Sequence, residues 1–157
     1  MANNTVNIWG HMKCVVENYA ERTYVKLLQK ENNAFILISG TEWDILKQDA
    51  AYIDQSLTSL YNYRSSLSQV TTVTVEKCNA TKYVSFHKKI KTNKGFMQNK
   101  FINLKLRQWD DLYIAMPQID ELYKAKRKCT AYMRRTSRYT KKLYNQHCRV
   151  PRRKTAR

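Results

Sequence analysis

A pattern that spans 20 residues occurs twice in this chain, at residues 35–54 and 101–120, with a constant offset of 66 positions. Phe, Ile, Trp, Asp, Leu, Ile and Asp recur at matching places in the two copies, without a gap. A constant offset indicates one structural unit used twice. Because a duplicated unit can supply both halves of a two-fold binding surface within one chain, this repeat constrains the fold more than any other feature.

The length of 157 residues suffices for one ordinary domain or two small ones. Hydrophobic residues make up 43% of the chain, which is enough for a core, and with three glycines and two prolines we expect no long flexible linker. No apolar run approaches ~18 residues, so we expect no membrane span. The N-terminus has neither a basic start nor an apolar stretch, so we expect no signal peptide.

The first repeat, residues 1–66, shows strand patterns followed by one helix pattern. Alternating or β-branched segments predict strands at residues 6–9, 12–16, 23–28 and 34–38. Ser39 followed by Glu42 is a capping box, which predicts a helix start. Apolar residues then recur at steps of three and four and share one helix face. They are Trp43, Leu46, Ala50, Ile53, Leu57 and Leu60.

The second repeat, residues 67–124, follows the same order. Strands are predicted at residues 70–75, 82–86 and 100–104. The apolar face of the second helix consists of Trp109, Leu112, Met116, Ile119 and Tyr123. Pro117 lies inside this helix at the place of Ala51, and a proline there should kink or break it.

The two repeats differ in length at one place and in charge throughout. From Tyr24 to Trp43 is 19 residues, whereas from Tyr83 to Trp109 is 26, so seven extra residues fall between the strands of the second repeat. Residues 1–66 carry a net charge of −1, residues 67–121 carry +4, and residues 122–157 contain 14 basic side chains and no acid. Such a basic block repels itself and attracts a polyanion.

The segment from Lys100 to Trp109, continued by Leu112 and by Ile119-Asp120, resembles the last strand and helix of the positive cofactor four family of transcriptional coactivators. The phrase typical of that family is approximately K-G-I-S-L-N-L-x-Q-W-x-x-L, with I-D at the same later spacing. The first repeat is similar through Trp43 and Ile53-Asp54. The resemblance covers about 25 residues of each repeat, and Phe101 and Pro117 depart from it.

The resemblance implies an α+β fold. Each repeat would be a curved antiparallel sheet followed by one helix, and the repeats would pair through their helices as an intramolecular pseudo-dimer, followed by a basic tail at residues 125–157. The residues implied to pack at the pair interface or in the core are Trp43, Leu46, Ile53, Trp109, Leu112 and Ile119.

Sheets of that family form channels for single-stranded nucleic acid, which implies contacts from the middle strand and the following loop. Those residues here are Lys88, Lys89, Lys91, Lys94, Phe96 and Lys100, and we group Lys82 with them. Lysines beside aromatic rings suit single strands, because ammonium groups neutralise phosphates while rings stack on exposed bases. The alternative is a solvated lysine-rich hairpin. The first repeat offers fewer such side chains, so we expect it to act chiefly as a scaffold.

Basic residues of the tail, interleaved with tyrosines, are further candidates for phosphate contact. They are Lys126, Arg127, Lys128, Arg134, Arg135, Arg138, Lys141 and Lys142. The alternative is a helix extension packed by its tyrosines, with a charged outer face. The runs at residues 126–128 and 152–154 are also compatible with nuclear import signals.

Catalytic motifs are missing from the sequence. It has no glycine-rich phosphate loop, no nucleophile elbow and no H-E-x-x-H, and its three histidines are isolated, so we expect no enzyme, no metal and no cofactor. Without a C-x-x-C pair the four cysteines are expected to be reduced thiols. Cys129, His147 and Cys148 form at most an incomplete zinc set.

The sequence therefore predicts a nucleic-acid-binding protein, with single-stranded DNA as the expected partner in transcription or replication. Duplex DNA, RNA and the transcription machinery remain alternative partners, and a homodimer of the two-repeat chain remains an alternative to the monomer. A second hypothesis is a structural nucleoprotein that condenses DNA non-specifically through its tail. The architecture favours a nuclear location or, in a large DNA virus, the virion or nucleocapsid.

Overall fold

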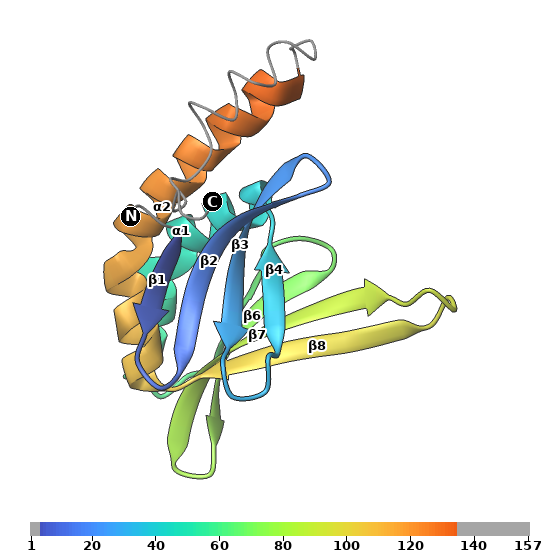
Figure 1. Cartoon of the computed structure of the whole chain (residues 1–157). Coiled ribbons are helices and arrows are strands. Elements are labelled where there is room, and N and C mark those ends of the chain that lie inside the picture. Colours follow the sequence, from blue (N-terminus) through green and yellow to red (C-terminus); the bar gives the residue numbers. More distant parts are fainter. Residues whose placement is uncertain (1–3, 135–157) are drawn as a thin grey trace.

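The structure is a computed structural model of the chain, and it describes residues 4–134, with side chains described through Cys129. It contains two four-stranded antiparallel sheets, each followed by a helix (Figure 1). The first unit consists of β1 (Thr5–Ile8), β2 (Met12–Tyr19), β3 (Arg22–Gln29), β4 (Phe35–Ile38) and α1 (Gly40–Ser56). The second unit consists of β5 (Tyr63–Ser66), β6 (Thr71–Cys78), β7 (Thr81–Lys91), β8 (Met97–Leu104) and α2 (Leu106–Arg134). The predicted α+β fold with two repeated units is confirmed.

Both sheets are simple meanders, with strand orders β1-β2-β3-β4 and β5-β6-β7-β8. β3 and β4 pair over four residues each, from Val25–Ile38 to Leu28–Phe35. β7 and β8 continue the equivalent pairing to Lys91–Met97. The seven inserted residues thus lengthen the strands themselves, and the β7–β8 hairpin projects beyond the rest of the molecule (Figure 1). We call residues 88–100 of this hairpin the arm.

β5 was not predicted. Its four residues, Tyr-Arg-Ser-Ser, have no apolar alternation, and only Ser65 among them is buried. The strand forms because Tyr63 to Ser66 pair with β6 from Val75 to Thr72, as β1 pairs with β2 in the first sheet.

α1 begins where the sequence predicts. Ser39 is its N-cap, the Ser39 hydroxyl accepts from the Glu42 N–H, and the Glu42 carboxylate accepts from the Ser39 N–H. The predicted apolar face extends too far, however, because α1 ends at Ser56 and Leu60 is 95% exposed. Hydroxyls of Ser56, Thr58 and Ser59 bond to nearby backbone carbonyls in this segment, which competes with helix continuation.

α2 runs through Pro117 as one helix of 29 residues, so the prediction of a break there is wrong. Pro117 removes one backbone hydrogen bond, which costs about 1 kcal/mol, more if its ring is strained. Leu112, Met116, Ile119 and Tyr123 are buried on both sides of it, and each buried side chain of this size contributes roughly 1.5–3 kcal/mol. Burial along the whole face therefore outweighs the local loss.

The two units are interlocked. α2, from the second unit, lies against β1, β2 and β3 of the first sheet, while α1 contacts β5 and β6 of the second. Two hydrogen bonds are reciprocal: the Trp43 indole N–H donates to Asp120 at 3.0 Å, and the Trp109 indole N–H donates to Asp54 at 3.1 Å. Both tryptophans are fully buried in one continuous core that draws on both sheets.

The remaining predicted interface residues belong to the same core. Leu46, Ile53, Leu112 and Ile119 are each at most 1% exposed, and each lies on the inner face of its helix. The repeated phrase thus supplies side chains with which α1 and α2 each enter the shared core.

Candidate nucleic-acid interface

Strand alternation divides the lysines of the arm into two sets. Neighbouring side chains of a strand point to opposite faces of the sheet. Lys88 and Lys100, paired across β7 and β8, continue the inner face that carries Val84 and Phe86. Lys89 and Lys91 lie on the opposite face, which we call the outer face of the second sheet. The two sets therefore have different partners.

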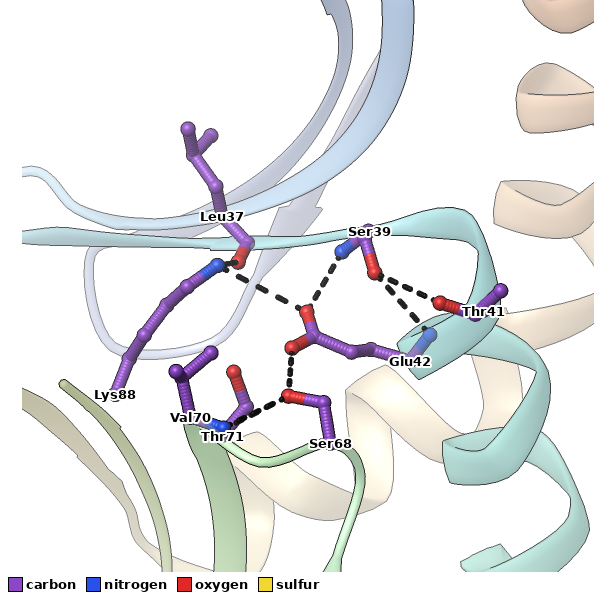
Figure 2. Close-up of polar contacts among 8 residues, drawn as sticks. All are labelled: Leu37, Ser39, Thr41, Glu42, Ser68, Val70, Thr71 and Lys88. Atoms are coloured by element: carbon purple, nitrogen blue, oxygen red, sulfur yellow. Dashed lines mark hydrogen bonds and ion pairs between the residues drawn. The ribbon is translucent and has the colours of Figure 1, made fainter. Parts of the chain in front are cut away.

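Lys88 faces the first unit. Its ammonium group donates to the Leu37 carbonyl at 2.6 Å and lies 3.8 Å from the Glu42 carboxylate (Figure 2). Only 17% of its side chain is exposed. The contact ties the second sheet to β4 and to the start of α1, so Lys88 has a structural role and little access to a ligand.

Glu42 is the centre of this polar cluster. It is 3% exposed and accepts from the Ser39 N–H at 2.9 Å and from the Ser68 hydroxyl at 2.6 Å (Figure 2). Burial alone would raise the pKa of Glu42, but these hydrogen bonds and the charge of Lys88 outweigh it and hold the pKa below its usual value. One capping-box residue thus both starts α1 and fastens the β5–β6 turn.

Lys100 also faces the first unit. Its ammonium lies 4.2 Å from the centre of the Phe35 ring, and Lys26 lies 4.6 Å from the same ring. Lys26 forms an ion pair with Glu17 at 3.6 Å as well. Both cations are thereby engaged by the protein itself through cation–π and ionic contacts.

The outer face of the second sheet carries the other set. Lys89 and Lys91 are exposed there. His87 stands beside Phe101 on this face, with ring centres 6.2 Å apart, and Phe101 is 58% exposed. Arg64 belongs to the same face and lies on β5, the edge strand opposite β8.

A hollow of about 240 Å³ lies on this face. Its lining is mostly basic and polar, with one acid and one valine: Arg64, Val70, Thr72, Thr74, Glu76, His87, Lys89 and Asn99. Cations, amide and hydroxyl groups with an exposed ring at the edge are the groups that contact phosphates and stack on unpaired bases.

The tip of the arm is open to solvent. Lys94 and Phe96 lie in the connection between β7 and β8, and Phe96 and Met97 are 69% and 61% exposed. Gly95 has φ +87°, a left-handed conformation that favours glycine at this turn. The tip therefore presents an apolar ring and a cation beyond the hollow.

Lys82 lies at the other end of β7, away from the arm. Its ammonium group donates to the carbonyls of Ser56, Ser59 and Tyr61 at 2.7–2.8 Å. These carbonyls belong to the last residue of α1 and to the segment that follows it, so Lys82 caps that helix rather than joining the outer face.

The first basic residues of the tail belong to α2. Arg127 and Lys128 are exposed, whereas Lys126 is half-buried and its pKa is lowered by burial, with Glu17 acting in the opposite direction. Arg134 ends the helix. The predicted contacts Arg135, Arg138, Lys141 and Lys142 lie outside the described residues.

The first sheet presents a different outer face. At the places equivalent to Arg64, His87 and Asn103 it carries Thr5, Leu28 and Leu37. Two aliphatic side chains thus replace an imidazole and an amide, and a hydroxyl replaces a guanidinium. At these three places the first sheet lacks the basic and polar groups of the second, although its outer face also carries Lys13, Lys26 and Lys30.

Sequence reasoning missed Arg64 and Phe101 as members of this face. Arg64 was missed because β5 was not predicted, and Phe101 because it stands at a place of the repeated phrase that was compared only with the family motif. The sequence did contain a signal for Phe101. Asn99, Phe101 and Asn103 are spaced two residues apart along β8, which places all three on the same face of the sheet as Lys89.

Other site chemistry is limited in the described part of the chain. Within residues 4–134 no cluster of three or more His, Cys, Asp or Glu side chains is arranged to hold a metal ion, and neither helix is long and apolar enough to cross a membrane. Cys14 and Cys78 are free thiols, as expected, whereas Cys129 is disulfide-bonded, contrary to expectation. Neither a protein-family model nor a curated protein sequence matches the chain.

Proposed function

We propose that this protein binds single-stranded nucleic acid, with single-stranded DNA as the expected form, on the outer face of the second sheet and the tip of the arm. The observation that carries the proposal is the combination on one face of Lys89, Lys91 and Arg64 with the exposed rings of Phe101 and His87 around a hollow. Cations would neutralise phosphates, and each ring that stacks on a base contributes about 1–3 kcal/mol.

We propose further that the two units act as an intramolecular counterpart of the dimer of the positive cofactor four family. The reciprocal bonds from Trp43 to Asp120 and from Trp109 to Asp54 support this, because they join the residues that the repeated phrase shares with the family. A role in transcription or replication, and a nuclear or virion location, follow from the resemblance and remain part of the proposal.

The test is a salt-titrated comparison of binding. Fluorescence anisotropy of labelled oligothymidine should show tighter binding than a duplex of equal length at the same salt. The triple variant Lys89→Gln, Lys91→Gln, Lys94→Gln should weaken binding and reduce the slope of log K against log salt by about 0.7 for each phosphate that is no longer neutralised. Phe101→Ala should weaken binding by roughly tenfold while leaving the salt slope unchanged.

Lys30→Gln is the matched control, because Lys30 is exposed at the place in the first unit equivalent to Lys89. It should leave binding unchanged. Equal affinity for single strands and duplex, or an equal reduction in affinity from Lys30→Gln and Lys89→Gln, would contradict the proposal.

The tail-based alternative can be tested without damaging α2. Removal of residues 135–157 takes away nine basic side chains and leaves the whole helix in place. Under our proposal the shortened chain keeps a measurable preference for single strands. If it binds neither form, the protein is a non-specific condensing nucleoprotein. An RNA function would appear as tighter binding of RNA than of DNA with the same sequence.

A further inference from the structure

A second hollow, of about 730 Å³, lies between the β2–β3 turn, the start of α1 and the C-terminal half of α2. Its polar lining includes Arg22, Thr41, Asp44, Tyr123 and Arg127. The proposed function makes no use of this hollow.

The hollow exists because the two units depart from symmetry here. At the equivalent place in the second unit, α1 ends and the Lys82 ammonium fills the space by bonding to three carbonyls. In the first unit the residue equivalent to Lys82 is Thr23, a shorter side chain that donates to Asn18 at 2.8 Å. α2 does not end at this level but continues to Arg134, so nothing equivalent to the Lys82 ammonium fills the space within the described residues.

Hydrogen-bond donors converge on the hollow. α1 has 17 residues, and the N–H groups of its first turn point out of the helix at its positive end. The capping box uses the N–H groups of Ser39 and Glu42, and those of Gly40 and Thr41 are left for an outside acceptor. Within the described residues neither Arg22 nor Arg127 forms a salt bridge.

Tyr123 gives an independent indication of a ligand. It is 8% exposed, lines the hollow, and its hydroxyl forms no hydrogen bond among the described residues. The hydroxyl oxygen itself is not fully buried, so it is accessible from the hollow and can donate to a ligand there. Burial raises the pKa of Tyr123, which keeps the hydroxyl protonated as a donor.

Gly40 is required for this arrangement, because a Cβ there would overlap the Tyr123 hydroxyl. The tyrosine can therefore reach the first turn of α1 only past a glycine. Two acids, Glu21 and Asp44, also line the hollow. Asp44 forms an ion pair with Lys47 at 3.3 Å, and Glu21 also interacts with another group of the protein.

We propose that this hollow is a phosphate-binding site, in which Arg22, Arg127, the Tyr123 hydroxyl and the N–H groups of Gly40 and Thr41 hold the phosphate oxygens. Guanidinium groups and a helix N-terminus are the donors that phosphate binds best in proteins. The phosphate is either free or part of a nucleic-acid strand, and the site lies apart from the outer face of the second sheet.

The test is an NMR titration of the ¹⁵N-labelled full chain with inorganic phosphate at constant ionic strength. The amide signals of Gly40 and Thr41 should shift saturably. Arg22→Gln and Arg127→Gln should each raise the dissociation constant about tenfold or more, because each removes a charge-assisted hydrogen bond. Lys128→Gln, an exposed cation one residue further along α2, should change it by less than about twofold.

Tyr123→Phe should weaken phosphate binding without loss of the helical circular dichroism signal. Gly40→Ala should abolish phosphate binding. Absence of saturable shifts at Gly40 and Thr41 would overturn the proposal. So would equal effects of Arg22→Gln and Lys128→Gln, since these would indicate a diffuse ion atmosphere.

A second arm distinguishes the source of the phosphate. Oligothymidine with and without a 5′-phosphate is titrated into the variant with Lys89→Gln, Lys91→Gln and Lys94→Gln, whose outer face is weakened. Shifts at Gly40 only with the 5′-phosphate assign a strand end, and shifts with both assign the strand interior. Shifts with inorganic phosphate alone assign a free phosphate. Because this site is read out at Gly40 and the outer face by anisotropy, either proposal can fail without the other.

Discussion

Asp120 and Asp54 occupy equivalent positions in the two helices, but Asp120 has more hydrogen-bond and ion-pair partners. Asp54 accepts the Trp109 N–H, whereas Asp120 accepts the Trp43 N–H, bonds to Lys47 at 2.7 Å and pairs with Lys124 at 3.2 Å. Burial would raise the pKa of Asp120, but the bonds from Lys47, Trp43 and Lys124 outweigh it and lower the pKa. The symmetric pair of bonds is thus reinforced on one side only.

This inequality predicts unequal costs of removal. Asp120→Ala should lower the free energy of unfolding by about 2–3 kcal/mol, because it leaves a buried indole N–H unpaired and removes a charge-assisted bond. Asp54→Ala, the matched variant, should cost about 1–2 kcal/mol. Urea denaturation at pH 7 measures both. A larger cost for Asp54→Ala would show that the ionic contacts of Asp120 contribute nothing.

Glu42 predicts a specific dependence of stability on pH. Its pKa in the folded state is below the usual value of 4.5, so the stability it contributes is present above that value and is lost as the pH falls through the folded pKa. Urea midpoints between pH 7 and pH 2.5 should therefore decline below about pH 4.5. In Glu42→Gln the midpoint at pH 7 should be lower and the acid decline shallower.

Some acid dependence should persist in Glu42→Gln, because the pKa of Asp120 is lowered as well. The double variant Glu42→Gln, Asp120→Asn should be flatter still. If the urea midpoint of the double variant falls at acid pH as much as that of the unchanged protein, other carboxylates cause the pH dependence of stability.

Among the elements, α2 departs most from expectation. A proline inside a helix costs up to ~3 kcal/mol relative to alanine. Pro117→Ala should therefore raise the free energy of unfolding by about 1–3 kcal/mol, since it restores the missing donor to the Tyr113 carbonyl. Ala51→Pro places the same residue at the equivalent position of α1 and should lower stability by about 3 kcal/mol or more. An unchanged free energy of unfolding in Pro117→Ala would mean that the backbone of α2 accommodates the Pro117 ring without strain.

The arm shows how one strand serves two purposes. Lys88→Met should lower the free energy of unfolding by about 1–3 kcal/mol, because Glu42 loses its cation, while the salt slope of oligonucleotide binding is unchanged. Lys89→Gln should do the reverse: stability is unchanged, and the salt slope falls by about 0.7. Thermal denaturation and anisotropy on the same two variants separate the roles. A binding defect in Lys88→Met without loss of stability would contradict the division.

How far the sequence predicted these elements depended on whether the information was local. The capping box of Ser39 and Glu42 and the apolar faces begun by Trp43 and Trp109 lie within a few turns of chain, and the structure has them as expected except for Leu60. β5 was missed because its pairing with β6, not its composition, makes it a strand. The partners of Lys82 and Lys88 are 21 or more residues away in the chain, so their structural roles were invisible to any pattern.

For the whole molecule, the differences between the outer faces of the two sheets predict one single strand per chain. Leu28 and Leu37 on the first sheet offer neither phosphate contacts nor exposed rings at the places of His87 and Asn103. Titration of short oligothymidine, too short to span both sheets, at protein concentrations far above the dissociation constant should reach its end point at one strand per chain. An end point of two would mean that the first sheet binds as well.

The interlocking of α1 and α2 with the sheets also bears on how the two halves could come to differ. In a homodimer of single units, both subunits have the same sequence, so a substitution that is useful in one subunit is always present in the other as well. Here each half meets the same neighbour in every molecule. Leu28 and Leu37 on one sheet can then differ from His87 and Asn103 on the other, and no mixture of mismatched assemblies arises.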